Sequence, residues 1–468
     1  MNRTERGKNF IDRDKLYQLI DTPEPAEFEI NRILNKALEL KGLQLEEVAK
    51  LLRIHRSEHL YKLLQTAQKV KSGIYGKRLV FFAPIYTGNV CVNNCTYCSF
   101  RRDNKLINRK VLTMSEIAEE TRTLLREGHK RVLLICGESP RNNADYMVEA
   151  IRTTYGAKER NGRDYIRRIN VELAPMEVED FQKLKAEKIG TYVCFQETYD
   201  PVAYSKFHPA DTPKGDYLYR LSVMDRAMEG GIDDVGIGAL FGLADYRFEV
   251  LAMMEHAAHL ERAFGCGPHT VSVPRIESAV GAPDAEHIPH KVSDPDFQKI
   301  VAILRIALPY TGIILSTREN NEMRDKLCQY GVSQISAGSR TNPGAYTHDE
   351  QQTGSQFSLG DHRSLDEVIS SLIDKEYIPS FCTGCYRKGR VGHDFMDLAK
   401  PGLIQQFCFP NALFTFKEYL EDFASPETKA KGLKLIDKFI HEEKNASLKE
   451  RIEKNMARLN QGERDVYL

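Results

Sequence analysis

Eight short runs of apolar, β-branched and aromatic residues alternate with amphipathic stretches between residues 79 and 336. This alternation predicts repeated βα units, and eight such units within about 260 residues match the size of a closed (β/α)8 barrel. We therefore expect an α/β fold with a TIM barrel core, whose active site lies at the C-terminal ends of the strands. The predicted strands cover residues 79–86, 131–136, 170–173, 191–196, 234–240, 270–273, 312–315 and 333–336.

Helical patterns flank the barrel on both sides. Apolar residues recur at roughly 3.6-residue spacing before residue 78, which predicts a helical extension over residues 1–78. The barrel takes residues 79–360, and a separate, mainly helical C-terminal segment takes residues 361–468. Within that segment the helical signals fall at 365–374, 416–423 and 433–454.

The charge balance of the chain limits its partners. Lysine plus arginine and aspartate plus glutamate both number 66 among 468 residues, so no basic excess points to nucleic acid or anionic lipid. The N-terminus is charged and lacks an apolar segment, and no apolar run reaches the ~18 residues that a membrane span needs. We expect a cytoplasmic protein that acts on small molecules, with no nucleic acid and no membrane as partner.

The loop after the first predicted strand carries Cys91, Cys95 and Cys98 in a C-x3-C-x2-C arrangement. A cubane with four irons that receives only three protein thiolates keeps one iron open for another ligand. A zinc knuckle or a disulfide cluster is the alternative. Zinc commonly takes four ligands, however, and residues 89–104 contain no fourth cysteine or histidine.

A second group, Cys382, Cys385 and Cys408, has the pattern C-x2-C-x22-C. A structural zinc ion completed by His393 is one reading. An iron-sulfur cluster with an open iron, able to bind a substrate or an extra metal, is the other. The basic residues after Cys385 would favour an anionic cluster, or they form a solvated face. The four remaining cysteines are expected to be buried thiols: Cys136, Cys194, Cys266 and Cys328.

Long stretches of the chain carry a family resemblance. Tyr97 places an aromatic residue just before the last cysteine of the first group, and the second cysteine group follows near the C-terminus. With these features, the chain from about residue 42 onwards resembles the tyrosine lyases of FeFe-hydrogenase maturation, within the radical S-adenosylmethionine (SAM) superfamily. The matching runs are 84–98, 195–199, 224–229, 267–275 and 315–319.

The resemblance implies a radical SAM barrel with two iron-sulfur clusters, in which SAM binds the open iron of a 4Fe-4S cluster beside L-tyrosine. A deoxyadenosyl radical takes a hydrogen atom from the tyrosine amino group, and the Cα–Cβ bond breaks. The products are p-cresol and dehydroglycine. Dehydroglycine becomes carbon monoxide and cyanide, captured on an additional iron of the auxiliary 4Fe-4S cluster as an Fe(CO)2(CN) precursor of the hydrogenase H-cluster. Partners would be other hydrogenase maturases and a reductant protein, and free cysteine is a candidate ligand of the extra iron.

The resemblance also assigns roles around SAM. Cys91, Cys95 and Cys98 are identified as ligands of the SAM cluster, and Tyr97 would lie near the adenine. Glu138 takes the place of the acidic residue that meets the SAM amino group, although the triplet Cys136-Gly137-Glu138 lacks the first glycine of the family motif. The expected contacts to the SAM ribose and carboxylate are Glu197 and Arg220.

Further roles concern the substrate and the second cluster. Arg318, with Ser316 beside it, is expected to hold the tyrosine carboxylate, because the guanidinium fork matches a carboxylate; a surface ion pair is the alternative. His269 would be the imidazole ligand of the extra iron, although without the resemblance a buried core histidine is the simpler reading. The expected auxiliary-cluster ligands are Cys382, Cys385 and Cys408.

Two other functions remain open. The related tyrosine lyase of thiamine biosynthesis shares the barrel and the first cleavage but is expected to lack the C-terminal cysteine triplet, which this chain has. A non-catalytic iron-sulfur carrier or scaffold would use both clusters without a SAM site or a tyrosine pocket.

Overall fold

A closed ring of eight parallel strands forms the centre of the computed structural model, which describes residues 8–348, 354–392, 394 and 405–468. Each strand pairs with the next, and β10 pairs with β1, where Val80 lies opposite Gln334. The predicted (β/α)8 barrel is therefore confirmed. The strands of the ring are β1 (Arg78–Gly88), β2 (Arg131–Cys136), β5 (Arg168–Glu172), β6 (Thr191–Val193), β7 (Asp234–Gly238), β8 (Thr270–Ser272), β9 (Gly312–Leu315) and β10 (Gln334–Ser336).

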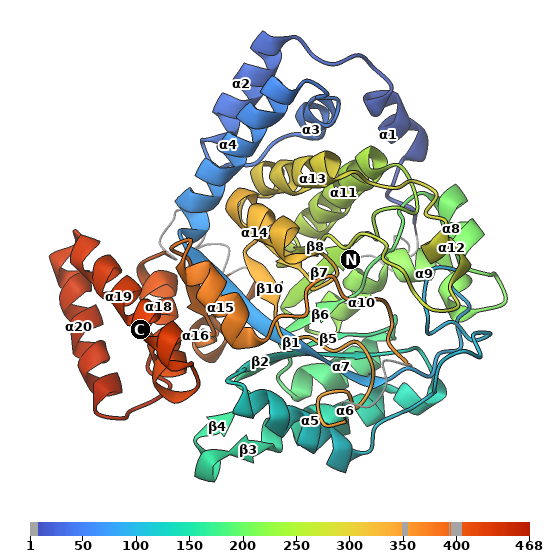
Figure 1. Cartoon of the computed structure of the whole chain (residues 1–468). Helices are drawn as coiled ribbons and strands as arrows, with labels where there is room; N and C mark the ends of the chain where they lie inside the picture. Colours follow the sequence, from blue (N-terminus) through green and yellow to red (C-terminus); the bar gives the residue numbers. More distant parts are fainter. Residues whose placement is uncertain (1–7, 349–353, 393, 395–404) are drawn as a thin grey trace.

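Helices cover the outside of this ring (Figure 1). Most of them begin at a residue whose side chain caps the first turn, although α7 and α10 do not. At the start of α5, for example, the Thr113 hydroxyl accepts a hydrogen bond from the amide of Glu116, and the Glu116 carboxylate accepts one from the amide of Thr113. Their apolar faces are buried against the strands. These helices are α5 (Met114–Arg126), α6 (Ala144–Gly156), α7 (Val178–Ala186), α10 (Val223–Glu229), α11 (Tyr246–Phe264), α13 (Asp294–Ala307), α14 (Asn321–Tyr330) and α15 (Leu365–Ile373).

The N-terminal helices lie over α11 and α13 (Figure 1). The first of them is tied to a loop at the top of the barrel, because Arg13 and Tyr17 both donate hydrogen bonds to the Asp200 carboxylate, at 2.9 Å and 2.7 Å. The extension thus braces the loop that follows β6. These helices are α1 (Arg13–Ile20), α2 (Glu27–Ala37), α3 (Leu45–Leu52) and α4 (Ser57–Tyr75).

The C-terminal segment is attached at the opposite end of the barrel, where the strands begin. A short strand, β11 (Ile378–Ser380), pairs with the first residues of β1. Three helices lie together in this segment (Figure 1), and the first of them packs on β11: α18 (Gln405–Asp422), α19 (Pro426–Glu442) and α20 (Ala446–Asn460). The residues after β11 therefore run beneath the barrel, and they include the short helix α16 (Gly384–Arg387).

Two small elements lie outside the sequence prediction. The strand β11 contains proline and has only three residues, so its pattern is too short to detect. The hairpin of β3 (Lys158–Glu159) and β4 (Asp164–Tyr165) is polar and has no apolar alternation. No helix within the described residues combines the length and the apolar character needed to cross a membrane.

Arg305, which is fully buried, holds the turn between α13 and β9 together. Its guanidinium donates to the carbonyl oxygens of Pro309, Thr311 and Gly331 at 2.7–3.0 Å. Arg305→Met would leave these carbonyls without a donor, so we expect a loss of about 3–5 kcal/mol in unfolding free energy. Thermal unfolding monitored by circular dichroism checks this against Arg262→Met, an exposed change on α11. An equal effect of the two substitutions would contradict the assignment.

Candidate functional site

The loop after β1 brings Cys91, Cys95 and Cys98 to one cavity of about 130 Å³ at the top of the barrel. A half-buried arginine fixes the loop, because the Arg109 guanidinium donates to four backbone carbonyls within residues 89–104. The barrel thus places all three predicted thiols together at the end where its active site was expected.

These three thiols border one cavity, so they can serve together as ligands of an iron-sulfur cluster. Ligands of one zinc ion must all approach to about 2.0–2.3 Å, whereas a cubane spreads its thiolates over separate irons. Burial raises the pKa of the Cys98 thiol to about 12, so this sulfur needs a bound cation to remain a thiolate. The residues present fit an iron-sulfur cluster.

Glu138 stands beside the cysteine loop in the same cavity. The Asn93 amide donates a hydrogen bond of 2.6 Å to the Glu138 carboxylate, and the backbone carbonyl of Glu138 accepts a hydrogen bond from the amide of Val92. Gly137 lets the loop pass closely, since a Cβ atom there would lie 2.6 Å from the carbonyl oxygen of Val90. The second glycine of the motif is therefore required by packing, although the first is Cys136.

Glu197 and Arg220 also line this cavity, together with a residue that sequence reasoning missed. The Lys214 ammonium lies 2.6 Å from the Glu197 carboxylate, while Arg220 lies 3.5 Å from it and donates to the carbonyl of Phe195. Burial opposes ionisation of Glu197, but Lys214 and Arg220 offset it, so the pKa of Glu197 lies below its usual value. Glu197 also has a left-handed backbone, φ 71°, at this site.

Tyr97, the predicted neighbour of the adenine, is buried in the same cavity. Its hydroxyl and His208 Nε2 are joined by a hydrogen bond of 2.8 Å. The structure therefore gathers the four predicted SAM contacts around the first cysteine group. Two of the isolated cysteines, Cys136 and Cys194, border the cavity as well, whereas Cys266 and Cys328 are buried elsewhere. All ten cysteines of the chain are described, and none of them forms a disulfide.

A second cavity, of about 80 Å³, lies within the barrel and shares Arg318 with the first. Arg318 does not form the surface ion pair considered as an alternative: its guanidinium lies over the ring of Phe357, 3.3 Å from the ring centroid. Ser316 lines the same cavity, and its hydroxyl accepts the amide of Arg318 at 3.4 Å. Burial lowers the pKa of Arg318.

Three further residues of this inner cavity were not singled out from the sequence. Glu172, at the end of β5, and Gln356 border both cavities, and the Gln356 amide lies 3.9 Å from the Cys98 sulfur. The Gln356 carbonyl accepts the hydroxyl of Tyr86 at 2.8 Å. A signal for Glu172 was present, because it is an acidic residue at the end of a predicted strand, where functional residues of this fold stand.

At the other end of the barrel Cys382, Cys385 and Cys408 border a cavity of about 60 Å³ together with His269. The Cys385 and Cys408 thiols are in hydrogen-bonding contact, which together with Arg78 and Arg390 lowers the pKa of Cys408. The amide of Gly384 donates to the Cys382 sulfur at 3.3 Å. These groups fit an anionic cluster.

The positive charge at this floor cavity comes partly from an unexpected source. Arg78 and Arg131, at the starts of β1 and β2, line the cavity, and Arg131 donates to the carbonyl of Cys382 at 3.0 Å. Arg387, one of the basic residues noted in the sequence, instead pairs with Asp465. His393, the proposed fourth zinc ligand, lies outside the described residues.

His269 stands between two polar side chains. Its Nε2 and the Tyr386 hydroxyl are joined by a hydrogen bond of 3.0 Å, and its Nδ1 lies 3.5 Å from the Asp234 carboxylate. Burial lowers the pKa of His269, which keeps the imidazole neutral, the form that binds iron. A carboxylate on the far nitrogen is the usual second partner of a metal-binding histidine.

The three cavities form a series along the barrel axis. The upper and inner cavities share Arg318 and Glu172, and the inner and floor cavities share Gln334. The two cysteine groups thus lie at opposite ends of one row of cavities. This is the arrangement that a small fragment would need to pass from one group to the other.

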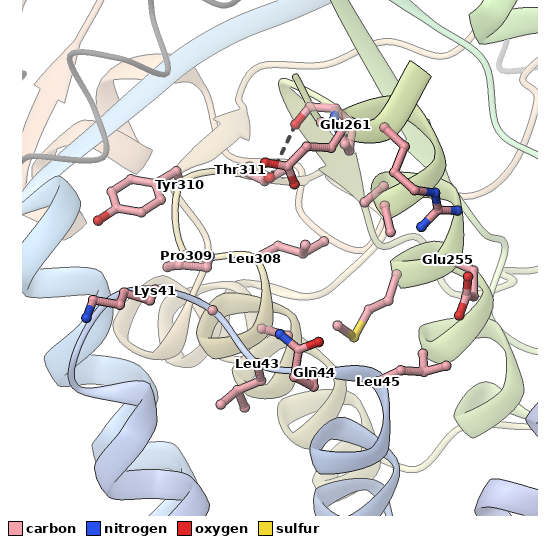
Figure 2. Close-up of a pocket in the computed structure, with 18 of the residues that line it drawn as sticks. Lys41, Leu43, Gln44, Leu45, Glu255, Glu261, Leu308, Pro309, Tyr310 and Thr311 are labelled. Atoms are coloured by element: carbon pink, nitrogen blue, oxygen red, sulfur yellow. Dashed lines mark hydrogen bonds between the residues drawn. The ribbon is translucent and has the colours of Figure 1, made fainter. Parts of the chain in front are cut away.

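A larger hollow, of about 660 Å³, lies outside this row (Figure 2). It is open to solvent between the N-terminal helices, α11 and the turn before β9, and Leu43, Leu308 and Glu255 are among its lining residues. It contains none of the predicted site residues. Tyr310 borders both this hollow and the floor cavity.

Comparisons with known proteins agree with the geometry. Residues 85–257 match the radical SAM superfamily, and residues 272–378 match the biotin and thiamin synthesis associated domain. A solved structure of HydG, described as a maturase of the FeFe-hydrogenase, is 45% identical, with TM-score 0.95 over 98% of this chain and 100% of that one. HydG from Carboxydothermus hydrogenoformans is 42% identical, with TM-score 0.83 over 96% and 99%. The 2-iminoacetate synthase of Escherichia coli is 29% identical over 72% of this chain and 87% of that protein.

Proposed function

Since this chain belongs to the HydG family of radical SAM maturases, we propose that it cleaves L-tyrosine at the Cα–Cβ bond, yielding p-cresol and dehydroglycine. Dehydroglycine is then converted to carbon monoxide and cyanide, which are assembled on an iron of the auxiliary cluster as an Fe(CO)2(CN) precursor for the FeFe-hydrogenase. The observation that carries this proposal is the pair of cysteine triplets at opposite ends of one row of cavities.

The upper cavity would hold the radical-generating group. Cys91, Cys95 and Cys98 would bind a 4Fe-4S cluster, and bound SAM would supply the radical chemistry. The Glu138 carboxylate, oriented by Asn93, would accept a hydrogen bond from the SAM amino group. Glu197, held ionised by Lys214, suits the ribose hydroxyls, and Tyr97 suits the adenine. Arg220 already donates to the carbonyl of Phe195 and lies near Glu197, so part of its donor capacity is used within the protein.

The inner cavity would hold tyrosine. Arg318 would bind the carboxylate, with Ser316 fixing the backbone next to it. The enclosing barrel excludes water and limits the number of hydrogen atoms within reach of a radical. Asn170 and Gln334 add polar groups to the wall of this otherwise largely apolar cavity, where they could meet a phenol.

The floor cavity would hold the second 4Fe-4S cluster on Cys382, Cys385 and Cys408, with its additional iron on the neutral imidazole of His269. Arg78 and Arg131 would offset the negative charge of the cluster and of the cyanide product. Free cysteine is a candidate for the remaining organic ligand of that iron. Other hydrogenase maturases and a reductant protein would be the partners.

The other functions fit the site less well. A tyrosine lyase of thiamine biosynthesis would not need three thiols and an imidazole beneath the barrel. A carrier or scaffold would not need a SAM cavity with an ionised glutamate, nor an inner cavity with a free guanidinium.

The test is to incubate the reduced protein, loaded with both clusters, with SAM and tyrosine. We expect p-cresol and 5′-deoxyadenosine in equal amounts, identified by liquid chromatography and mass spectrometry. 5′-Deoxyadenosine without p-cresol would support a radical SAM enzyme with another substrate. Neither product from fully loaded protein would favour the carrier.

His269→Ala should remove the extra iron while the auxiliary cubane remains, because the three cysteines are untouched. The measurement is iron per chain by elemental analysis, with the cubane followed by electron paramagnetic resonance. His259→Ala, a half-buried histidine paired with Asp225 on the outer helices, is the matched control. Iron content equal to that of the parent protein would contradict the ligand role.

A further inference from the structure

Glu172 is a carboxylate that protein groups leave unsatisfied. It stands at the C-terminal end of β5 and borders both the SAM cavity and the inner cavity. Its side chain makes no hydrogen bond or ion pair with any residue that the structure describes. Such a group within the barrel indicates a ligand that donates hydrogen bonds or carries positive charge.

Other buried carboxylates of the barrel behave differently. Glu249 accepts the hydroxyl of Thr198 and the amide of Tyr199, and Glu120 accepts the amides of Tyr346 and Thr347. Hydrogen bonds from the chain thus orient these two carboxylates, which hold loops in place. Glu172 differs from them, because no such bond from a described residue orients its carboxylate.

Arg318, which carries the opposite charge, also has a side chain without a hydrogen-bond or ion-pair partner among the described residues. The Arg318 guanidinium borders the same two cavities, lies on the ring of Phe357, and makes no hydrogen bond or ion pair with described residues. Glu172 and Arg318 influence each other electrostatically without forming an ion pair. One carboxylate and one guanidinium facing a shared space are complementary to an amino-acid zwitterion.

We propose that Glu172 binds the ammonium group of the amino-acid substrate and accepts one proton from it, while Arg318 binds the carboxylate. This deepens the proposed function and rests on it. The proton moves from the substrate nitrogen to a Glu172 oxygen, which converts an ammonium and a carboxylate into an amine and a carboxylic acid. No electron is transferred in this step.

The step has a physical reason. The proposed chemistry removes a hydrogen atom from the substrate nitrogen, and doing so from an ammonium would leave a charged radical close to Arg318 in a cavity shielded from water. Removal from a neutral amine avoids that charge. Burial, reinforced by the nearby Glu197, raises the pKa of Glu172 to about 7, which suits a proton acceptor at neutral pH. The titratable and charged groups that face it are Glu197, Arg318, Arg220, Lys214 and Tyr86.

The first test measures binding without reductant, on the protein loaded with clusters and SAM. Tyrosine and desaminotyrosine, which lacks the amino group, are titrated by calorimetry. We expect Glu172→Gln to weaken the binding of tyrosine on the order of 30-fold and to leave the affinity for desaminotyrosine unchanged. Arg318→Gln should weaken the binding of both ligands. Glu179→Gln, an exposed change on α7, should weaken the binding of neither. Equal loss of both ligands in Glu172→Gln would overturn the assignment.

The second test is the pH dependence of kcat/KM for tyrosine. The parent protein should gain activity as the pH rises through about 7, because Glu172 must be ionised to accept the proton. That acidic limb should vanish in Glu172→Gln and persist in Glu172→Asp, which keeps a carboxylate. A limb unchanged in Glu172→Gln would assign the proton acceptor elsewhere. If the parent protein bound no tyrosine, the proposed function itself would fail. If the parent protein bound tyrosine and Glu172→Gln matched it in tyrosine affinity and pH dependence, only the role of Glu172 would be rejected.

Discussion

Cys95→Ala is expected to abolish 5′-deoxyadenosine and p-cresol formation together, by at least on the order of a thousandfold. Cys95 is buried in the loop after β1 and borders the upper cavity with Cys91 and Cys98. Removal of its sulfur leaves two thiolates, too few to keep a cubane with a single open iron. The other two thiols that border this cavity, Cys136 at the end of β2 and Cys194 just after β6, lie outside the loop that carries the triplet.

Three measurements check this expectation: the two products by chromatography, the iron content, and the visible absorption of the clusters. Iron should fall by the share of one cubane, because the floor cavity is unchanged. Cys328→Ala is the matched control, a buried thiol on α14 outside all three cavities, and it should keep both activities at a small cost in stability. Product formation by Cys95→Ala above background would mean that the SAM cluster is held elsewhere.

The barrel could be predicted from the sequence because its signal is local and repeated. Each strand is a short apolar run, and parallel strands buried on both faces read as such runs. The predicted bounds for 131–136 and 312–315 agree with β2 and β9. By contrast, β11 pairs with β1 across about 300 residues of chain, and three residues that include a proline carry no periodic signal.

Some residues of the candidate site could also be predicted from the sequence, and others could not. Cysteine spacing indicated the two cysteine groups, and the ends of the strands indicated Glu138 and Glu197. The roles expected for Tyr97, Arg220 and His269 came from the family resemblance.

Lys214, Asn93 and Arg131 were missed because their roles depend on which segments meet in space: Lys214 reaches Glu197 from a loop beyond α8 (Pro201–Phe207). Glu172 was missed for another reason. It was included in the apolar run 170–173, although an acidic residue near the end of a predicted strand is the signal that could have found it.

Cys385→Ala should separate the two halves of the proposed reaction. Cys385 contacts Cys408 in the floor cavity, which shares none of its lining residues with the upper cavity; the inner cavity lies between the two. We therefore expect p-cresol formation within about threefold of the parent protein, since no contact of the upper cavity changes. Iron-bound carbon monoxide, measured by infrared spectroscopy, should fall to background.

The direction of this asymmetry is what makes the experiment informative. In the proposed reaction the radical step takes place before any fragment reaches the floor cavity, so damage at the floor would stop capture without stopping cleavage. Capture without cleavage is not expected, because Cys95→Ala removes the source of the fragments and must lose both p-cresol and iron-bound carbon monoxide. Loss of 5′-deoxyadenosine in Cys385→Ala, with the protein folded and the upper cluster intact, would mean that the two clusters act as one unit. The fragments would then not be passed between separate sites at the two ends of the barrel.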